Sequence, residues 1–370
     1  MDFYSFQDQI KQHLQQQLPF VMYRQPHENE VKAQLQPNNT LEYVNDFQEK
    51  GFVFAPFNAS KKPILFSHAS AEAISCSQES VEVALATSTY LEKRGEQERY
   101  EELVQKTIKA IQQTGIDKIV VSRKKEIIKE TDVFTYFKNL LSLYPEAMVY
   151  CWYHPKVGLW MGATPETLVK TEGKRLKSMA LAGTQVYQDT TKVSWGEKEK
   201  EEQAMVTRAI VDGLSSIKAV SNLQVGEPST ARAGSVLHLR TNITANFELE
   251  SLGKIIKELH PTPAVCGLPY ELAYDYILKE ENYDRSFYTG YLGELNMQHQ
   301  KNRNPRRRNV ENSAYLSVST QTNLYVNLRC MQVFKDRVEI YVGGGITKDS
   351  IPQAEWEETQ RKAETMQKVL

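Results

Sequence analysis

The chain has 370 residues, of which 41% are hydrophobic and 25% are charged, and its formal net charge is −1. These values are typical of a globular protein with a substantial core, and the balanced charge argues against the strongly basic face of a nucleic-acid binder. No segment approaches the roughly 20 apolar residues that cross a bilayer, and the first residues lack the apolar run of a secretion signal, so we expect a cytoplasmic protein with a small-molecule substrate and no nucleic-acid or membrane partner.

The predicted elements begin with a helix at the N-terminus, where Phe3, Phe6, Ile10 and Leu14 recur on one helical face. Apolar runs predict strands in GFVFAPF (51–57), KPILFSH (62–68), KIVVSR (118–123), EAMVYCWYH (146–154), GLWMGAT (158–164), LYVNLRCMQVF (324–334) and RVEIYVGGG (337–345). Further helices are predicted at about 96–113, 195–218, 249–259 and 352–368.

Several of these strands are close in sequence and linked by turns, which favours antiparallel pairing. We therefore predict an α+β fold, a single large domain over 1–370 of mainly antiparallel β-sheets with helices on the outer faces. The cysteines are scattered singly, without the close pairs of zinc or redox sites, and are interpreted as reduced packing residues. Five basic residues between 301 and 308 lie in a polar run without aromatic neighbours, which predicts a solvated loop rather than a nucleic-acid patch.

Two predicted helices carry paired carboxylates. In the first, Ser194 and Glu197 have the spacing of a capping box, Glu199 and Glu202 lie three residues apart, and an apolar stripe follows. The buried stripe is expected from Val206, Ile210 and Leu214.

In the closing helix, Ser350 is a candidate cap, Pro352 suits the first turn, and Glu355 and Glu358 again lie three apart, one turn before Lys362. Either pair alone could simply favour the helix dipole. If the two helices meet across a cleft, four carboxylates converge and require a cation, for which magnesium is the natural candidate.

Other polar residues lie on or beside predicted strands. Lys118 begins a strand, and a buried lysine there would suggest catalysis because burying the charge costs free energy. Glu166 follows a Thr-Pro corner, where it could cap the turn or act as an acid. A strand that ends in the glycines at 343–345 would bring bare N–H groups close to an anion in a cleft, and a tight strand-to-helix turn is the alternative. Further donors and close-approach positions are Gly183, Thr184, His238, Tyr288 and Arg329.

Taken in order, a series of motifs resembles the chorismate-utilising enzymes. The motifs are DKIVVSR, TPETL, LAGT, EKEKEEQ, LHLRT, HPTPAVCGLP, RSFYTGYLGEL, VNLRC and GGGITKDSIPQAEWEETQRK. They are collinear over about 96–365, whereas 1–95 carries no motif that we can assign. Within the family, the chain looks most similar to isochorismate synthase.

The resemblance implies roles for the residues named above. Lys118 would activate water for attack at C2 of chorismate, and Glu166 would protonate the departing C4 hydroxyl. Glu202 and Glu358 would ligate Mg²⁺, which holds the ring carboxylate, with Glu199 and Glu355 assisting. Tyr288 and Arg329, with backbone from Gly343, Gly344 and Gly345, would take the enolpyruvyl carboxylate, and the other expected substrate-binding residues are Gly183, Thr184, His238, Ala264, Val265 and Lys362.

The resemblance also bears on the reaction. Members that make anthranilate generally carry glutamine at the position of Lys118, and aminodeoxychorismate synthases commonly carry lysine at the position of Ala182, so both branches are disfavoured. Salicylate synthases share Lys118 and Glu166 and remain an alternative, although Ala264 and Val265 look more like a synthase that stops at isochorismate. A catalytically silent, anion-binding member of the fold is the other alternative.

One departure from the family is that Gln203 stands where many members have histidine, which puts only local helix contacts in doubt. We expect a monomeric isomerase of menaquinone or siderophore biosynthesis.

Overall fold

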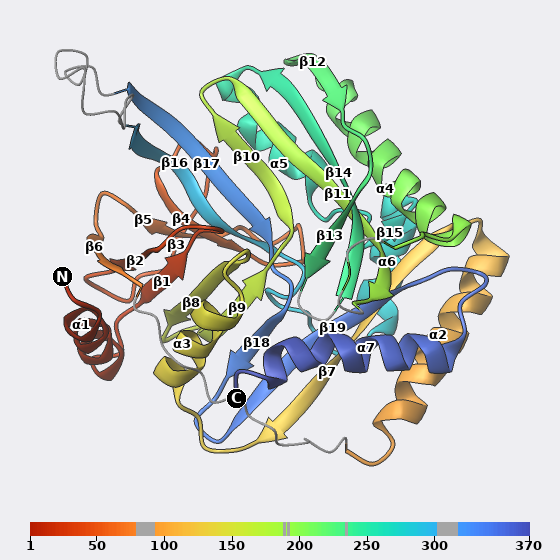
Figure 1. Ribbon diagram of the computed structural model, residues 1–370, viewed down its shortest axis with the longest axis horizontal. Helices are drawn as coiled ribbons and strands as arrows, with labels where there is room; N and C mark the ends of the chain where they lie inside the picture. Colours follow the sequence, from red (N-terminus) through yellow and green to blue (C-terminus); the bar gives the residue numbers. More distant parts are fainter. Residues whose placement is uncertain (79–92, 188–189, 191–192, 234–235, 302–316) are drawn as a thin grey trace.

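Two large antiparallel sheets dominate the fold (Figure 1). The computed structural model describes residues 1–78, 93–187, 190, 193–233, 236–301 and 317–370. Every strand pairing among these residues is antiparallel.

The first sheet has nine strands. In spatial order they are β15 (Gly267–Leu268), β7 (Lys118–Ile128), β19 (Arg337–Ile346), β18 (Cys330–Val333), β9 (Gly158–Thr164), β8 (Met148–His154), β1 (Phe20–Arg24), β2 (Glu30–Leu35) and β6 (Glu72–Ser77).

The second sheet has ten strands, nine in one continuous path and β13, which pairs with β14 off this path. In spatial order they are β12 (Val220–Val225), β14 (Val236–Phe247), β11 (Arg175–Val186), β10 (Thr167–Glu172), β17 (Ser317–Val326), β16 (Tyr291–Lys301), β4 (Gly51–Ala55), β5 (Ile64–Ser67) and β3 (Glu42–Tyr43), with β13 at Ser229–Ala233.

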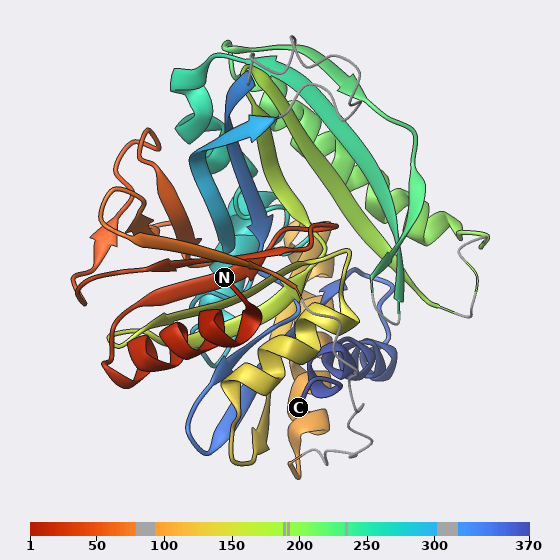
Figure 2. The same cartoon turned by 60° about the vertical axis from the view of Figure 1, so that its left-hand side comes forward.

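Helices cover the outer faces of both sheets. They are α1 (Phe3–Gln15), α2 (Glu96–Thr114), α3 (Val133–Leu143), α4 (Glu197–Ser216), α5 (Leu252–Leu259, preceded by a 3-10 turn at Leu249–Ser251), α6 (Tyr270–Glu280) and α7 (Pro352–Gln367). Helices α1, α3 and α7 pack on the first sheet, and α1 and α3 lie side by side in Figure 2. Helices α4 and α5 pack on the second sheet.

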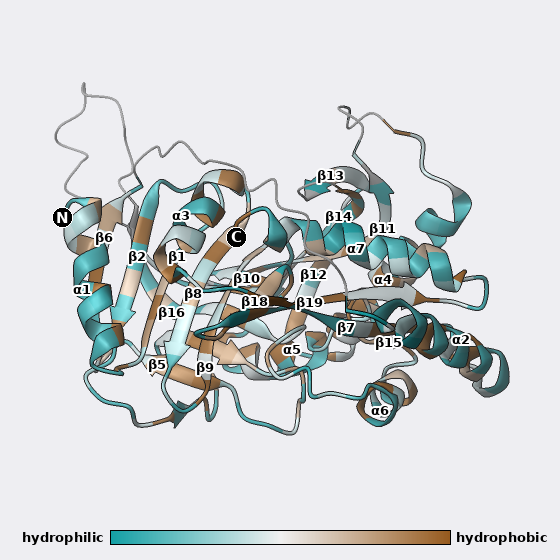
Figure 3. Cartoon of the chain, turned by 90° about the horizontal axis from the view of Figure 1, so that it is seen from below, coloured by the Kyte–Doolittle hydropathy of each residue, from teal (hydrophilic) through white to brown (hydrophobic). Residues whose placement is uncertain are grey.

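The two sheets pack face to face through an aromatic core. On β1, Val21 and Tyr23 point into this core, whereas Phe20 and Met22 point toward α1 and α3. Strands that are covered on both faces are buried along their whole length and mainly apolar, as β1 and β4 illustrate. Figure 3 shows the result, with brown central strands inside outer helices that are mainly teal.

The predicted α+β architecture with outer helices is therefore confirmed. The predicted helices at 96–113, 195–218, 249–259 and 352–368 correspond to α2, α4, α5 and α7. The run 324–334, predicted as one strand, is instead split between β17 and β18, which belong to different sheets. The basic residues Arg303, Arg306, Arg307 and Arg308 lie outside the described residues.

Two predicted helix caps are wrong. Helix α4 has Gly196 as its N-cap and no side-chain cap, so Ser194 and Glu197 form no capping box. Helix α7 has Ile351 as its N-cap, with proline in its first turn as predicted. The Ser350 hydroxyl instead donates to Glu355 Oε1 at 2.7 Å. None of the described helices is both long and apolar enough to cross a membrane.

Candidate active site

A cavity of about 900 Å³ lies beside β7, β11 and β19 and below the first turns of α4 and α7. It is lined by every residue that the sequence analysis assigned to catalysis, substrate or metal except Gly344. Residues that are far apart in the chain, such as Lys118, His238 and Lys362, therefore line the same cavity. Their individual roles stay predictions.

Lys118 is buried at the start of β7, with 2% of its surface exposed. Its Nζ donates to Glu202 Oε1 of α4 at 2.7 Å. A buried ammonium group needs such a partner, because desolvation without one is expensive. The ion pair joins the strand that carries the predicted base to the helix that carries two predicted metal ligands.

Glu166 lies in the corner between β9 and β10 and is 3% exposed. Burial raises the pKa of its carboxyl group to about 8, although the nearby charges of Lys118 and Arg329 act in the opposite direction. A carboxyl group with this pKa is mostly protonated at pH 7 and can donate a proton. The backbone of Glu166 is fixed because its carbonyl accepts from Val326 N at 3.0 Å.

Gly183 interrupts β11 with a bulge and a positive φ of 72°, where the pairing with β14 shifts register. A Cβ at this position would lie 3.2 Å from Glu199 Cβ, so glycine lets α4 approach the strand closely. The Gly183 carbonyl accepts from His238 Nδ1 at 2.9 Å. This hydrogen bond leaves His238 Nε2 as an acceptor, and burial lowers the pKa of His238 to about 4, so the ring is neutral.

Tyr288 and Arg329 supply further hydrogen-bond donors to the cavity. Tyr288 is buried and its ring stacks on Tyr341 with a centroid separation of 5.6 Å. Burial raises the pKa of Tyr288, so its hydroxyl stays protonated. Arg329 lies in the crossover between β17 and β18 with a φ of 47°, a strained conformation for a residue that is not glycine.

The glycines at 343–345 belong to a strand, as predicted for 337–345, and not to the strand-to-helix turn that was the alternative. They lie inside β19 and pair with Ser122, Val121 and Val120 of β7, because the strand continues to Ile346. A Cβ on Gly345 would lie 2.6 Å from Lys118 Cε, and one on Gly344 would lie 3.1 Å from Glu355 Oε2. The glycines therefore leave room for the side chains of Lys118 and Glu355, although Gly344 itself does not line the cavity.

The four predicted metal ligands reach the cavity from two helices, Glu199 and Glu202 from α4 and Glu355 and Glu358 from α7. Two of them are already paired, Glu202 with Lys118 and Glu358 with Lys362 at 2.6 Å. Across the described ranges, no three histidine, cysteine, aspartate or glutamate side chains form a group that could hold a metal ion.

The donor set nevertheless fits a hard cation, since it consists of carboxylate oxygens. Burial and the charge of Glu358 raise the pKa of Glu355, which indicates electrostatic crowding that a cation would relieve. Burial also disfavours the charge of Glu358, but the ion pair with Lys362 outweighs it and lowers the pKa of Glu358.

Several cavity residues were missed from the sequence. Thr289 and Leu328 each adjoin a predicted residue, and Lys198 and Glu201 lie in the same acidic segment as the predicted ligands. Only their neighbours in the motifs could have indicated them. Gln203, the noted departure, is buried and donates to Thr241 Oγ1 at 2.6 Å, so it ties α4 to β14 instead of lining the cavity.

Two family models match the chain. A model described as chorismate binding enzyme matches residues 60–302, and a second with the same description matches residues 312–368. The chain belongs to the chorismate binding enzyme family. The resemblance carried by the nine motifs is thus confirmed.

Members of this family with sequence similarity to the chain include three isochorismate synthases. The chain is 29% identical to the vibriobactin-specific isochorismate synthase of Vibrio cholerae, over 73% of this chain and 66% of that protein. It is 26% identical to isochorismate synthase MenF of Escherichia coli, over 73% and 59%, and 27% identical to EntC of the same organism, over 74% and 68%. The matches thus span about two thirds of these relatives' own length.

Solved structures of the chorismate binding enzyme family share the fold. Menaquinone-specific isochorismate synthase MenF from Escherichia coli superposes with a TM-score of 0.76 at 20% identity, over 95% of this chain and 88% of that one. Anthranilate synthase component I from Streptococcus pneumoniae gives a TM-score of 0.65 at 17% identity, over 94% and 89%. At these identities the likeness establishes the architecture.

Proposed function

We propose that this protein is an isochorismate synthase that converts chorismate to isochorismate. The observation that carries the proposal is the pairing of two buried groups on one cavity, a lysine and a carboxylic acid that burial keeps protonated. Addition of water to the ring and loss of a hydroxyl group need one group that accepts a proton and one that donates it. The names of the curated relatives support the same reaction.

In the proposed reaction, Lys118 acts as the general base and takes a proton from water as the water oxygen forms a bond to C2. The ring double bonds shift, and the C4–O bond breaks as Glu166 donates its proton, so the C4 hydroxyl leaves as water. The ring gains one hydroxyl group and loses another, so substrate and product are isomers. A proton then passes from Lys118 to solvent and another from solvent to Glu166, which restores both side chains for the next turnover.

The dianionic substrate also has to be held. Tyr288 and Arg329 would bind the enolpyruvyl carboxylate, a planar anion that suits a guanidinium group. Glu202 and Glu358, assisted by Glu199 and Glu355, would hold a magnesium ion. When bound, magnesium would neutralise and hold the ring carboxylate. Thr184, His238, Ala264 and Val265 would shape the remaining wall.

The product would serve menaquinone or siderophore biosynthesis. Two similar synthases are named menaquinone-specific and vibriobactin-specific, which supports this proposal. We further propose that the protein acts in the cytoplasm. Its cysteines, Cys76, Cys151, Cys266 and Cys330, are all buried and form no disulfide with one another, which suits a reducing compartment.

The test is to incubate the purified protein with chorismate and magnesium and to separate the products by chromatography. Isochorismate should accumulate, and isochorismate supplied alone should return chorismate, because substrate and product differ only in a hydroxyl position and the ring double bonds. Salicylate and pyruvate as the main products would favour the salicylate synthase alternative. Absence of any product would contradict the assignment as an enzyme.

A further inference from the structure

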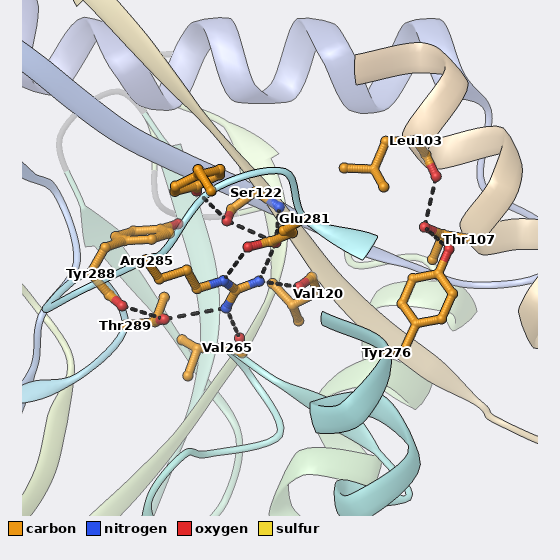
Figure 4. Close-up of polar contacts among 11 residues, drawn as sticks. Leu103, Thr107, Val120, Ser122, Val265, Tyr276, Glu281, Arg285, Tyr288 and Thr289 are labelled. Atoms are coloured by element: carbon orange, nitrogen blue, oxygen red, sulfur yellow. Dashed lines mark hydrogen bonds and ion pairs between the residues drawn. The ribbon is translucent and has the colours of Figure 1, made fainter. Parts of the chain in front are cut away.

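A buried ion pair lies directly behind the cavity and takes no part in the proposed chemistry. Glu281 caps the end of α6, and Arg285 lies in the loop that leads to β16. Both side chains are 1% exposed, and Arg285 donates to the two carboxylate oxygens of Glu281 at 2.7 and 2.5 Å. Figure 4 shows the pair at the centre of a network that spans several segments.

Arg285 uses all five of its N–H donors within this network. Besides the two bonds to Glu281, it donates to Val120 O at 2.6 Å, Val265 O at 2.9 Å and Thr289 Oγ1 at 3.2 Å. Five donors in a fixed planar fork are a property of arginine that lysine cannot reproduce. The guanidinium group is therefore a rigid junction that joins the backbone at Val120 and Val265 to the side chain of Thr289.

Each of these three segments forms part of the cavity wall. Val120 follows Lys118 by two residues on β7, Val265 adjoins Ala264, and Thr289 follows Tyr288. Thr289 itself has a φ of 60°, a strained conformation, and its hydroxyl donates to Tyr288 O at 2.6 Å. The junction thus constrains the predicted base, the pocket loop and the predicted carboxylate ligand together.

The pair also replaces a missing strand. On the side of β7 away from β19, the short strand β15 pairs only with Lys118 and Ile119. Beyond it, the Val120 carbonyl accepts from Arg285, while the Ser122 amide and hydroxyl donate to Glu281 Oε1 at 2.7 and 2.9 Å. The ion pair therefore satisfies the open edge of the strand that carries Lys118.

We infer that Glu281 and Arg285 are positioning residues, which hold Lys118, Val265 and Tyr288 at fixed mutual distances for turnover. This inference rests on the proposed function for its kinetic consequence. A misplacement of about 1 Å in a catalytic group can cost about 100-fold in rate, so loosening this junction should lower kcat.

The chain offers a matched control for a variant of Arg285. Arg24 is also fully buried and donates to the Leu141 and Tyr144 carbonyls at 2.8 and 2.6 Å, but it does not line the cavity. Both R285K and R24K lose guanidinium bonds to buried backbone and should unfold at lower temperature than the wild type. At a temperature where both are folded, kcat should fall at least about 10-fold in R285K and stay within about twofold in R24K.

Hydrogen exchange supplies a readout that needs no turnover. R285K should speed the exchange of the amides of Val120 and Ser122, whereas R24K should speed exchange near Tyr144 and leave 118–122 protected. If the wild-type protein does not convert chorismate, the proposed function fails, and this pattern alone still tests the positioning role.

The inference is overturned if R285K keeps wild-type kcat and wild-type protection at 118–122, or if both variants lose activity only in proportion to lost stability. Should R285K fail to fold, S122A takes its place, because it removes the hydroxyl bonds to Glu281 and Tyr283 and leaves no buried charge unpaired. We expect S122A to lower kcat about threefold and to speed exchange at 120–122, and unchanged values of both would overturn the inference.

Discussion

Glu166 couples the proposed chemistry to the stability of the fold. Its pKa is about 8 in the folded protein because of burial, and about 4.3 is expected in an unfolded chain. Between these pH values the folded state binds more protons than the unfolded state. The contribution of Glu166 to stability is therefore complete below about pH 4 and is lost as the pH rises through 8.

We predict that E166Q, which cannot ionise, becomes more stable relative to the wild type as the pH increases from 5 to 9, by on the order of a few kcal/mol. Urea unfolding of both proteins across this range measures the difference, in which the titration of other groups, such as His238 and His260, cancels. Parallel stability curves would contradict the burial of an ionisable carboxyl group here.

The same substitution should cost activity. E166Q and K118A should each lower turnover at least about 100-fold, because each removes a proton transfer and little packing. Circular dichroism would verify that both variants are folded. A near-normal rate in either one would reject its assigned role, and E166Q would then gain stability at no cost in function.

A separate prediction concerns the glutamates that are proposed to bind magnesium. E202Q and E358Q should each raise the magnesium concentration for half-maximal activity at least about 10-fold, since an amide is a poorer ligand for a hard dication than a carboxylate. E357Q is the matched control on the same helix, because Glu357 is exposed and does not line the cavity. Full activity of E202Q or E358Q in the presence of a chelator would show that these glutamates serve only their helices.

At the scale of elements, the glycines of β19 matter because side chains at their positions would collide with neighbouring residues. Because a Cβ on Gly345 would lie 2.6 Å from Lys118 Cε, G345A should displace the lysine and lower kcat at least about 10-fold. G213A on α4 is the control, since its Cβ would meet only the Glu258 side chain, which is exposed and can move. Steady-state kinetics of both variants, with thermal unfolding to confirm the fold, would decide; wild-type kinetics in G345A would mean that Lys118 adapts freely.

The elements also show where reasoning from sequence is strong and where it fails. Helices α2 and α4 could be predicted because apolar residues recur at helical spacing, and Val206, Ile210 and Leu214 are buried as expected. The split of 324–334 between two sheets could not, because continuous apolar character is the same in either sheet. The strand at 337–345 was predicted with its glycines, but its pairing with β7, more than 200 residues earlier in the chain, was not.

At the scale of the whole molecule, we predict a monomer in solution. Large exposed apolar side chains in the described residues are spread over several elements, for example Tyr4 on α1, Tyr43 on β3 and Val225 on β12, with three on α6 (Tyr270, Leu272 and Leu278). No continuous apolar face of the kind that obligate dimers bury is apparent from their distribution in these residues. Light scattering should give a mass near 42.4 kDa, and twice that value would contradict the prediction.

The cavity as a whole was predictable only through the family resemblance. Spacing alone put Glu199 near Glu202 and Glu355 near Glu358, but nothing local indicates that α4 and α7 share a cavity. The ion pairs of Glu202 with Lys118 and of Glu358 with Lys362 were likewise invisible, since they join residues by tertiary packing or by a choice of rotamer. The Glu281–Arg285 junction carried no signal at all, because a charged pair near a helix end usually faces solvent.

The pairing of β7 with β19 has a consequence for how the protein is made. Ser122 lies opposite Gly343, about 220 residues later, so the strand that carries Lys118 waits for nearly the last residues of the chain to be synthesised before it gains this neighbour. At a ribosomal rate of about 5 to 20 residues per second, that wait lasts roughly 10 to 45 seconds. Throughout it, one edge of an eleven-residue strand is unpaired, and nascent chains that terminate early keep it so. Such fragments should therefore be among the first clients of the cell's chaperones and proteases.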